Sequence, residues 1–200
     1  MKILAIRGKN IASLAEEFEI NFEDSPLAET GLFAITGNTG AGKSTLFDII
    51  CLALFDKTPR LKDQKKEKLV DDGENALTTT DTRNLLRRGT VEGFAEIDFL
   101  GVDKKTYRSR WAVRRSHNKI LGSLQAVSMS FLCLQSQKNL GNTKTEILAE
   151  IALKIGLNFD QFTRSVLLAQ NDFSAFLKAD EGERSELLET LTGKIGRAHV

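Results

Sequence analysis

The chain has 200 residues, of which 41% are hydrophobic and 28% are charged, enough to bury the core of one domain or of part of one. Its 28 Lys and Arg residues nearly balance 27 Asp and Glu, and the net charge of +1 excludes a global electrostatic drive toward nucleic acid or a membrane surface. Cys51 and Cys133 lie singly in apolar runs, so we expect no disulfides. Met1 precedes no apolar leader, and no stretch of about 18 apolar residues occurs. We therefore expect a cytoplasmic protein without a membrane span.

The first elements predicted along the chain are strands, followed by a helix. Residues 2–7 and 18–23 alternate or run apolar, and residues 32–36 form a short apolar run that we expect to be a buried central strand. Apolar residues recur at helical spacing from 43 to 55, and we expect Pro59 to end that helix.

The middle of the chain predicts a long loop and then an antiparallel meander. Residues 57–90 are polar and weakly periodic, which indicates a surface loop with one short helical turn. Strands are expected within 94–100, 105–115 and 124–135, and the short turn at 101–103 predicts a hairpin between the first two.

The last part of the chain predicts three helices. The first covers 143–155 and closes at Gly156. The second begins after Asn158, where Gln161 is placed to complete a capping box. The third opens at Asp180 and carries one short stripe of leucines.

The stretch "GNTGAGKS" fits the phosphate-loop pattern G-x-x-x-x-G-K-[ST] between a strand and a helix. Its glycines allow backbone N–H groups to surround phosphate oxygens, and the helix N-terminus adds a positive dipole end. Lys43 can reach the β- and γ-phosphates, Ser44 can ligate Mg²⁺, and Thr45 can contact an α-phosphate. The expected site for ATP and Mg²⁺ is Gly37, Asn38, Thr39, Gly40, Ala41, Gly42, Lys43, Ser44 and Thr45. The alternative is a glycine-rich turn with a fortuitous lysine.

Other parts of a hydrolysis site are missing from the sequence. A P-loop hydrolase also needs an acidic residue at the end of a second buried strand, and Asp98 lies in an alternating segment instead of an apolar run. The segment "LTGK" at 191–194 lacks the paired glycines of an ATP-binding-cassette signature, so we interpret it as a helix ending at Gly193.

A basic strand offers a possible DNA contact. Alternation places Thr106, Arg108, Arg110 and Arg114 on one face and Tyr107, Ser109, Trp111 and Val113 on the other. The arginines could follow a phosphate backbone, with Arg115, His117 and Lys119 extending the patch. The alternative is an ordinary solvated face with acidic neighbours from residues 57–90.

Four segments together resemble the SbcC family of SMC-like DNA repair ATPases: residues 31–61, 107–118, 162–179 and 183–193. The resemblance implies an α/β fold of the P-loop NTPase class, the N-terminal lobe of an ABC-type ATPase head. This lobe would contain a mixed sheet, an antiparallel meander and a helical subregion leading into a coiled coil, and it would be an incomplete domain.

The resemblance also assigns residues outside the phosphate loop. Gln170, in "LLAQ", would form the Q-loop that coordinates Mg²⁺ and senses the γ-phosphate, and with Lys43 it would be catalytic. The segment "KNIASL" would lie against the nucleotide, which implicates Asn10 and Ser13. Distant relatives carry an arginine where this chain has Ala12.

The resemblance finally implies boundaries and partners. Residues 1–179 would form the lobe, 180–194 would start the coiled-coil helix, and 195–200, whose back-translation matches a common sequencing adapter, would be a non-native tail. The complete ATPase would contain a second lobe. It would act as a complex with a second ATPase copy, an SbcD-like nuclease subunit and DNA. The competing interpretations are a transporter-type ATP-binding cassette and a nucleotide-binding fragment that cannot hydrolyse ATP.

Overall fold

The computed structural model describes residues 1–29, 35–62, 64–69 and 77–166. The chain divides into two units, Met1–Gly156 and Leu157–Val200, which are described separately. The expected Q-loop glutamine Gln170, the helix from Asp180 and the tail at 195–200 lie outside the described residues.

The first unit is built on a six-stranded sheet with the order β2-β1-β5-β6-β7-β8. The strands are β1 (Lys2–Lys9), β2 (Phe18–Asn21), β5 (Glu92–Leu100), β6 (Thr106–Arg114), β7 (Ser128–Cys133) and β8 (Lys138–Asn139). Every pairing is antiparallel, and β5, β6 and β7 follow one another as the predicted meander. The mixed sheet expected from the family is therefore antiparallel throughout in the described part of the chain.

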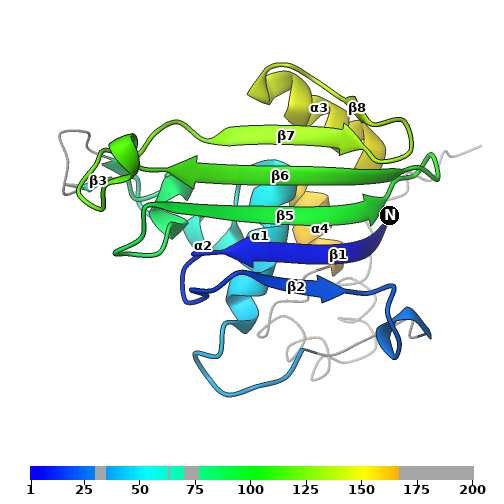
Figure 1. Ribbon diagram of the computed structural model, residues 1–200, viewed down its shortest axis with the longest axis horizontal. Coiled ribbons are helices and arrows are strands. Elements are labelled where there is room, and N and C mark those ends of the chain that lie inside the picture. Colours follow the sequence, from blue (N-terminus) through cyan, green and yellow to red (C-terminus); the bar gives the residue numbers. More distant parts are fainter. Residues whose placement is uncertain (30–34, 63, 70–76, 167–200) are drawn as a thin grey trace, which may run out of the picture. The chain divides into compact units, whose positions relative to one another are not determined.

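Helices α1 (Lys43–Phe55) and α3 (Lys144–Ile155) cover one face of this sheet (Figure 1). In Figure 1, α1 crosses behind the strands from the β2 side toward β6. Nearly all of α1 is buried, from Asp48 to Phe55, which is typical of a helix that is apolar on all sides and enclosed by neighbours. The helix predicted at 43–55 is confirmed at both ends.

The core lies between α1, α3 and the inner face of the sheet. Trp111 and Ser109 of β6 are fully buried there, and Ser109 Oγ donates to the carbonyl oxygen of Ala53 in α1 at 2.5 Å. Phe99, Tyr107 and Phe131 form an aromatic cluster with ring centroids 5.2 to 6.1 Å apart. Such contacts join three neighbouring strands into one packing unit.

Asp56 fixes the C-terminal end of α1. It is the helix C-cap in a left-handed conformation, with φ of 47°, and its N–H donates to Leu52. Its carboxylate accepts hydrogen bonds from Trp111 Nε1 at 2.6 Å and Thr82 Oγ1 at 2.7 Å, and it pairs with Lys144 of α3. One side chain thus ties α1 to β6, α3 and the loop before β5.

The predicted closure of one helix at Gly156 and the predicted capping box of Asn158 and Gln161 are confirmed, whereas the third predicted helix start, at Asp180, lies outside the described residues. The structure adds a capping box that was not predicted. Thr143 and Glu146 form a capping box at the start of α3, and Gly156, with φ of 74°, closes it. In the second unit, α4 (Phe159–Val166) begins after Asn158, whose N–H donates to Gln161 Oε1 while Gln161 N–H donates to Asn158 Oδ1. Reciprocal capping of this kind satisfies orphan donors at a helix start.

The described part of residues 57–90 contains more regular structure than the predicted surface loop. They contain α2 (Pro59–Lys62), the two-stranded β3 (Lys68–Leu69) and β4 (Leu77–Thr78), and a 3₁₀ turn at Thr82–Leu85. Pro59 does not end α1 but begins α2, where a missing N–H is tolerated. Single apolar side chains at Leu61, Leu77 and Leu85 are buried and anchor the segment.

The central strand expected at 32–36 is not found in its described part. Ile35 and Thr36 are exposed and have no strand assignment, while residues 32–34 lie outside the description. A strand needs a hydrogen-bonded neighbour, and none of the described strands pairs with these two residues.

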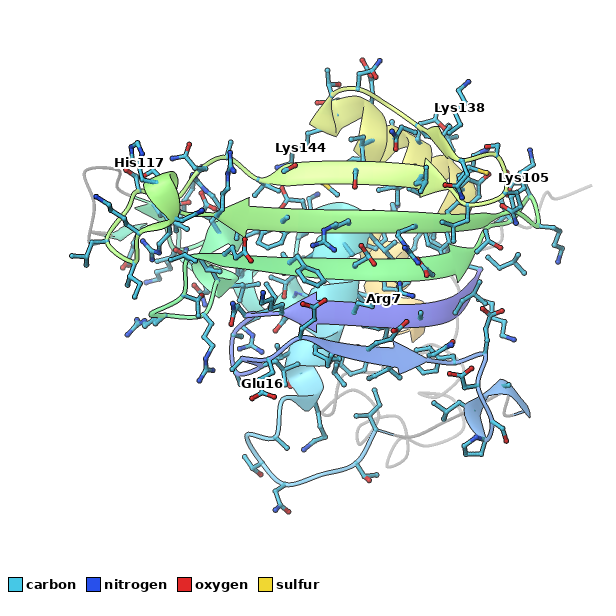
Figure 2. All side chains as sticks on the ribbon, viewed as in Figure 1. Arg7, Glu16, Lys105, His117, Lys138 and Lys144 are labelled. Carbon is cyan, nitrogen blue, oxygen red and sulfur yellow. The ribbon has the colours of Figure 1, made fainter. Side chains whose placement is uncertain are left out.

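The outer face of the sheet, turned away from α1, carries a row of paired charges that includes Arg7 (Figure 2). Arg108 donates to both carboxylate oxygens of Asp98 at 2.7 Å, and Arg110 pairs with Glu96 at 2.9 Å. Arg7 contacts Asp98 at 2.8 Å and Glu96 at 3.2 Å. The alternation predicted for β6 is confirmed, but the acidic neighbours come from β5 and not from residues 57–90.

The pairing shifts the titration of Asp98. Burial disfavours its charged form, but hydrogen bonds from Arg108 and Arg7 outweigh that cost, so the pKa of Asp98 lies below its usual range. A lowered pKa in the folded state means that the carboxylate stabilises the fold above the ordinary aspartate pKa. This contribution is lost as the pH falls through the folded-state pKa.

We predict that Asp98→Asn destabilises the protein by about 3 kcal/mol at pH 7, because it removes the buried carboxylate that Arg7 and Arg108 share and leaves Glu96 as their only common acidic partner. The difference from the parent should begin to shrink as the pH falls below about 4, the ordinary aspartate pKa, and should disappear only below the lowered folded-state pKa, where the parent carboxylate is also protonated. Urea denaturation at pH 7, 5, 4 and 3 measures both effects. Glu92→Gln on the same strand, which breaks only an exposed pair with Lys9, is the control and should cost about 0.5 kcal/mol. Equal costs for the two variants at pH 7 would contradict the account.

Candidate nucleotide site

The glycine loop leads directly into α1. Residues 35–38 have no regular structure and 39–42 turn into the helix, with Ala41 N–H donating to the Asn38 carbonyl at 3.2 Å. Gly40 and Gly42 have φ of 85° and 94°, conformations that residues with side chains rarely adopt. Gly42 is the N-cap of α1, and no side chain caps that end. The free N–H groups of the first helical turn therefore face the loop, as an anion site requires.

Lys43 lies across this loop. Its ammonium donates to the carbonyl oxygens of Gly37 at 2.5 Å and Asn38 at 2.8 Å. The structure thus brings the loop's first residues and its lysine together and holds a positive charge at its mouth. Thr39, Gly40 and Ala41 form the exposed rim between them.

The two hydroxyls that follow Lys43 have different surroundings. Ser44 is on the first turn of α1 and is exposed, so its oxygen is accessible to a cation. Thr45 is buried, and its Oγ1 lies 2.9 Å from Ser13 Oγ. The segment expected to lie against the nucleotide therefore contacts the phosphate-loop helix directly.

Two other residues of the segment "KNIASL", Asn10 and Leu14, are held by contacts with neighbouring elements. Leu14 packs on Gly42 so closely that a Cβ at position 42 would lie 2.8 Å from Leu14 Cδ2. The Asn10 side-chain amide donates to the Glu92 carbonyl at 2.9 Å, so it holds the segment to β5. Ser13 and Leu14, more than Asn10, are brought to the phosphate loop.

Asp48 is a buried carboxylate that the sequence analysis missed. It lies on α1 five residues after Lys43, accepts a hydrogen bond from Thr58 and pairs with Arg60 at 2.6 Å. Burial raises the pKa of Asp48, against the opposing influence of Thr58 and Arg60. An acidic residue inside the apolar run "LFDIICLALF" was the available signal. Its place in an ion pair makes it a link between α1 and α2.

The described residues do not supply the rest of a hydrolysis site. Asp98 is occupied by two arginines, which agrees with the expectation that it is not the metal-binding acid. Within residues 1–29, 35–62, 64–69 and 77–166, no cluster of three or more His, Cys, Asp or Glu side chains could hold a metal ion. Over the same part of the chain, the helices are all too short or too polar to cross a membrane.

We predict that Gly42→Ala lowers stability by about 3 kcal/mol, because it adds a clash with Leu14 to the strain of a positive φ. Gly40→Ala is the matched control: it has the same backbone strain but no heavy atom within 4 Å of the added Cβ, and should cost about 1 kcal/mol. Thermal unfolding of both variants provides the measurement. If the two unfolding temperatures fall equally, the packing of Leu14 on the loop is refuted.

Known proteins match this chain over most of its length. A family model described as an AAA domain matches residues 5–198. The SbcC polypeptide of the SbcCD nuclease from Pseudomonas aeruginosa is 56% identical over 193 residues, which cover 96% of this chain and 16% of the relative. The protein of the same name from Rhodobacter capsulatus is 46% identical over 194 residues, with the same coverage.

A more distant relative carries a different name. The probable DNA double-strand break repair Rad50 ATPase of Aquifex aeolicus is 29% identical over 162 residues, which cover 80% of this chain and 14% of the relative. The chain thus spans about one sixth of the length of the first two relatives. The predicted P-loop class and the resemblance to SbcC are confirmed: the chain belongs to the AAA domain family.

Proposed function

We propose that the chain is the nucleotide-binding part of an SbcC-type ATPase, whose ATP binding and hydrolysis regulate a DNA-processing nuclease. The observation that carries the proposal is Lys43, held across a glycine loop at the uncapped N-terminus of α1. The curated relatives named as parts of the SbcCD nuclease give the setting in which such a loop would act.

Each residue of the site has a proposed role. The backbone N–H groups of 37–43 surround the β-phosphate, and Lys43 moves from the loop carbonyls to the β- and γ-phosphates. Ser44 ligates Mg²⁺ through its accessible hydroxyl, and Thr45 with Ser13 lies next to the α-phosphate. Gln170, outside the described residues, would be the amide ligand that senses the γ-phosphate. Bound there, Mg²⁺ would supply positive charge to the phosphoryl oxygens.

Hydrolysis needs groups that the described residues do not provide. The three buried carboxylates of α1 and β5 in the described residues, Asp48, Glu96 and Asp98, are held in ion pairs. We therefore propose that a second lobe and a second copy of the ATPase supply the metal-binding acid and the signature loop. An SbcD-like partner would carry the nuclease chemistry, and residues 180–194 would begin the coiled coil.

We propose that DNA is contacted by the complete complex, and that Arg108 and Arg110 in the middle of β6 do not make this contact. Arg108 and Arg110 are neutralised by Asp98 and Glu96, so they offer little net charge to a phosphate backbone. Arg114, at the end of β6, is exposed. Of the three arginines, it is the one that suits a phosphate contact.

We predict that Lys43→Ala weakens Mg·ATP binding at least 100-fold, because it removes the only side-chain cation held at the loop in the described structure. Titration with a fluorescent ATP analogue measures the dissociation constant. Lys66→Ala, at an exposed lysine far along the chain, is the control and should bind as the parent does. An unchanged affinity of the Lys43 variant would remove the site.

Hydrolysis by the isolated chain is a separate prediction. We expect the 200-residue chain to show near-background steady-state ATPase activity. The full-length protein encoded by the natural reading frame around it should hydrolyse ATP. Both proteins are assayed side by side at saturating Mg·ATP. Full activity of the isolated chain would show that no second lobe is needed.

A further inference from the structure

The turn formed by residues 10–14 has a backbone that requires external support. Asn10 and Ala12 have φ of 53° and 45°, in the left-handed region that residues with a side chain adopt at a cost. Ile11 between them is fully buried and bridges to Leu86. A turn with two such residues keeps its shape only where neighbouring groups fix it.

The support comes from residues 85–87, which lie far away in the sequence. Ala12 N–H donates to the Leu85 carbonyl at 2.8 Å, and Arg87 N–H donates to the Asn10 carbonyl at 2.9 Å. The Arg87 side chain adds a second connection: its Nη1 donates to the carbonyl oxygens of Ala12 at 3.2 Å and Ser13 at 3.0 Å. A guanidinium bound to two successive carbonyls fixes the peptide plane between them.

The opposite side of the turn faces the phosphate loop. The peptide that Arg87 holds joins Ala12 to Ser13, whose hydroxyl reaches Thr45 on the first turn of α1. The next residue, Leu14, packs on Gly42, the N-cap of the same helix. The contacts therefore run from Arg87 through the 10–14 turn to the two residues that flank Lys43 and Ser44.

We propose that Arg87 is a positioning residue for the nucleotide site, acting through Ser13 and Leu14 rather than by contact with phosphate. The inference rests on the proposed function, since it assumes that the loop at 37–45 binds nucleotide. Arg87 orders the 10–14 turn, and the turn holds Thr45 and the Gly42 N-cap in the geometry that the triphosphate needs.

Direct contact between arginine and a bound anion is the competing account. Arg87 and its neighbour Arg88 both line an open hollow beside Ala12, where either guanidinium could meet a phosphate. The two accounts differ in what Arg88 does. If charge alone mattered, removal of either arginine would weaken binding, whereas only Arg87 carries the contacts to the turn.

The test compares Arg87→Ala, Ser13→Ala, their double variant and the matched control Arg88→Ala in the full-length product of the natural reading frame. The readout is the dissociation constant for a fluorescent ATP analogue with Mg²⁺. We expect Arg87→Ala to weaken binding about 10-fold and Arg88→Ala to stay within about twofold of the parent. The double variant should be little weaker than Arg87→Ala alone, because both changes act through one contact path.

Arg87→Lys keeps the charge, but its ammonium lies on a shorter side chain and cannot take the position of Nη1 between the two carbonyls, so it should weaken binding about threefold. This variant serves if Arg87→Ala does not fold. Three results would overturn the inference. The first is parental affinity in both Arg87 variants, and the second is an equal loss of affinity in Arg87→Ala and Arg88→Ala. The third is a double variant whose loss equals the product of the losses of Arg87→Ala and Ser13→Ala. A parent protein that does not bind ATP would instead refute the proposed function.

Discussion

The attachment of α1 to the antiparallel sheet is the constraint on which the rest of the structure depends. A phosphate loop has no rigidity of its own, and its amides converge only if the helix that follows it is fixed. Here the helix is buried along most of its length, and Asp56 ties its far end to Trp111 and Lys144. The N-terminal end is held by Leu14 on Gly42 and by Ser13 on Thr45. With both ends fixed, the first helical turn presents its N–H groups and Lys43 in one direction.

The two faces of the sheet have different roles. The inner face, with its buried aromatic and aliphatic side chains, supports α1 and hence the nucleotide site. The outer face binds its strands together through Arg7, Asp98 and Arg108, charges that are satisfied within the sheet. Because these charges neutralise one another, the outer face favours a stabilising role over a role in attracting DNA.

Much of the local structure could be predicted from residues that act on their immediate neighbours. The helix at 43–55, the helix end at Gly156, the capping box at Asn158 and the loop around Lys43 depend on spacing within a few positions. The strand alternation of β6 could be predicted too, but not its partners. Asp98 meets Arg108 only through the register of β5 and β6, which the turn sets and the residue pattern alone does not. The contacts of Arg87 could not be predicted for the same reason, because they join segments that lie more than 70 residues apart in the sequence. The strand predicted at 32–36 does not reach Ile35 and Thr36, its described residues, because an apolar run does not reveal whether a neighbouring strand is present to pair with it.

Hydrogen–deuterium exchange of the full-length protein with and without Mg·ATP tests the central claim most directly. If the amides of the glycine loop hold the triphosphate and the 10–14 turn is part of the same assembly, nucleotide should slow exchange in peptides covering 37–45 and 10–14. The buried part of α1, from Asp48 to Phe55, should change little because it is already fixed. Protection confined to other parts of the chain, with these two segments exchanging at the same rate in both states, would contradict the account.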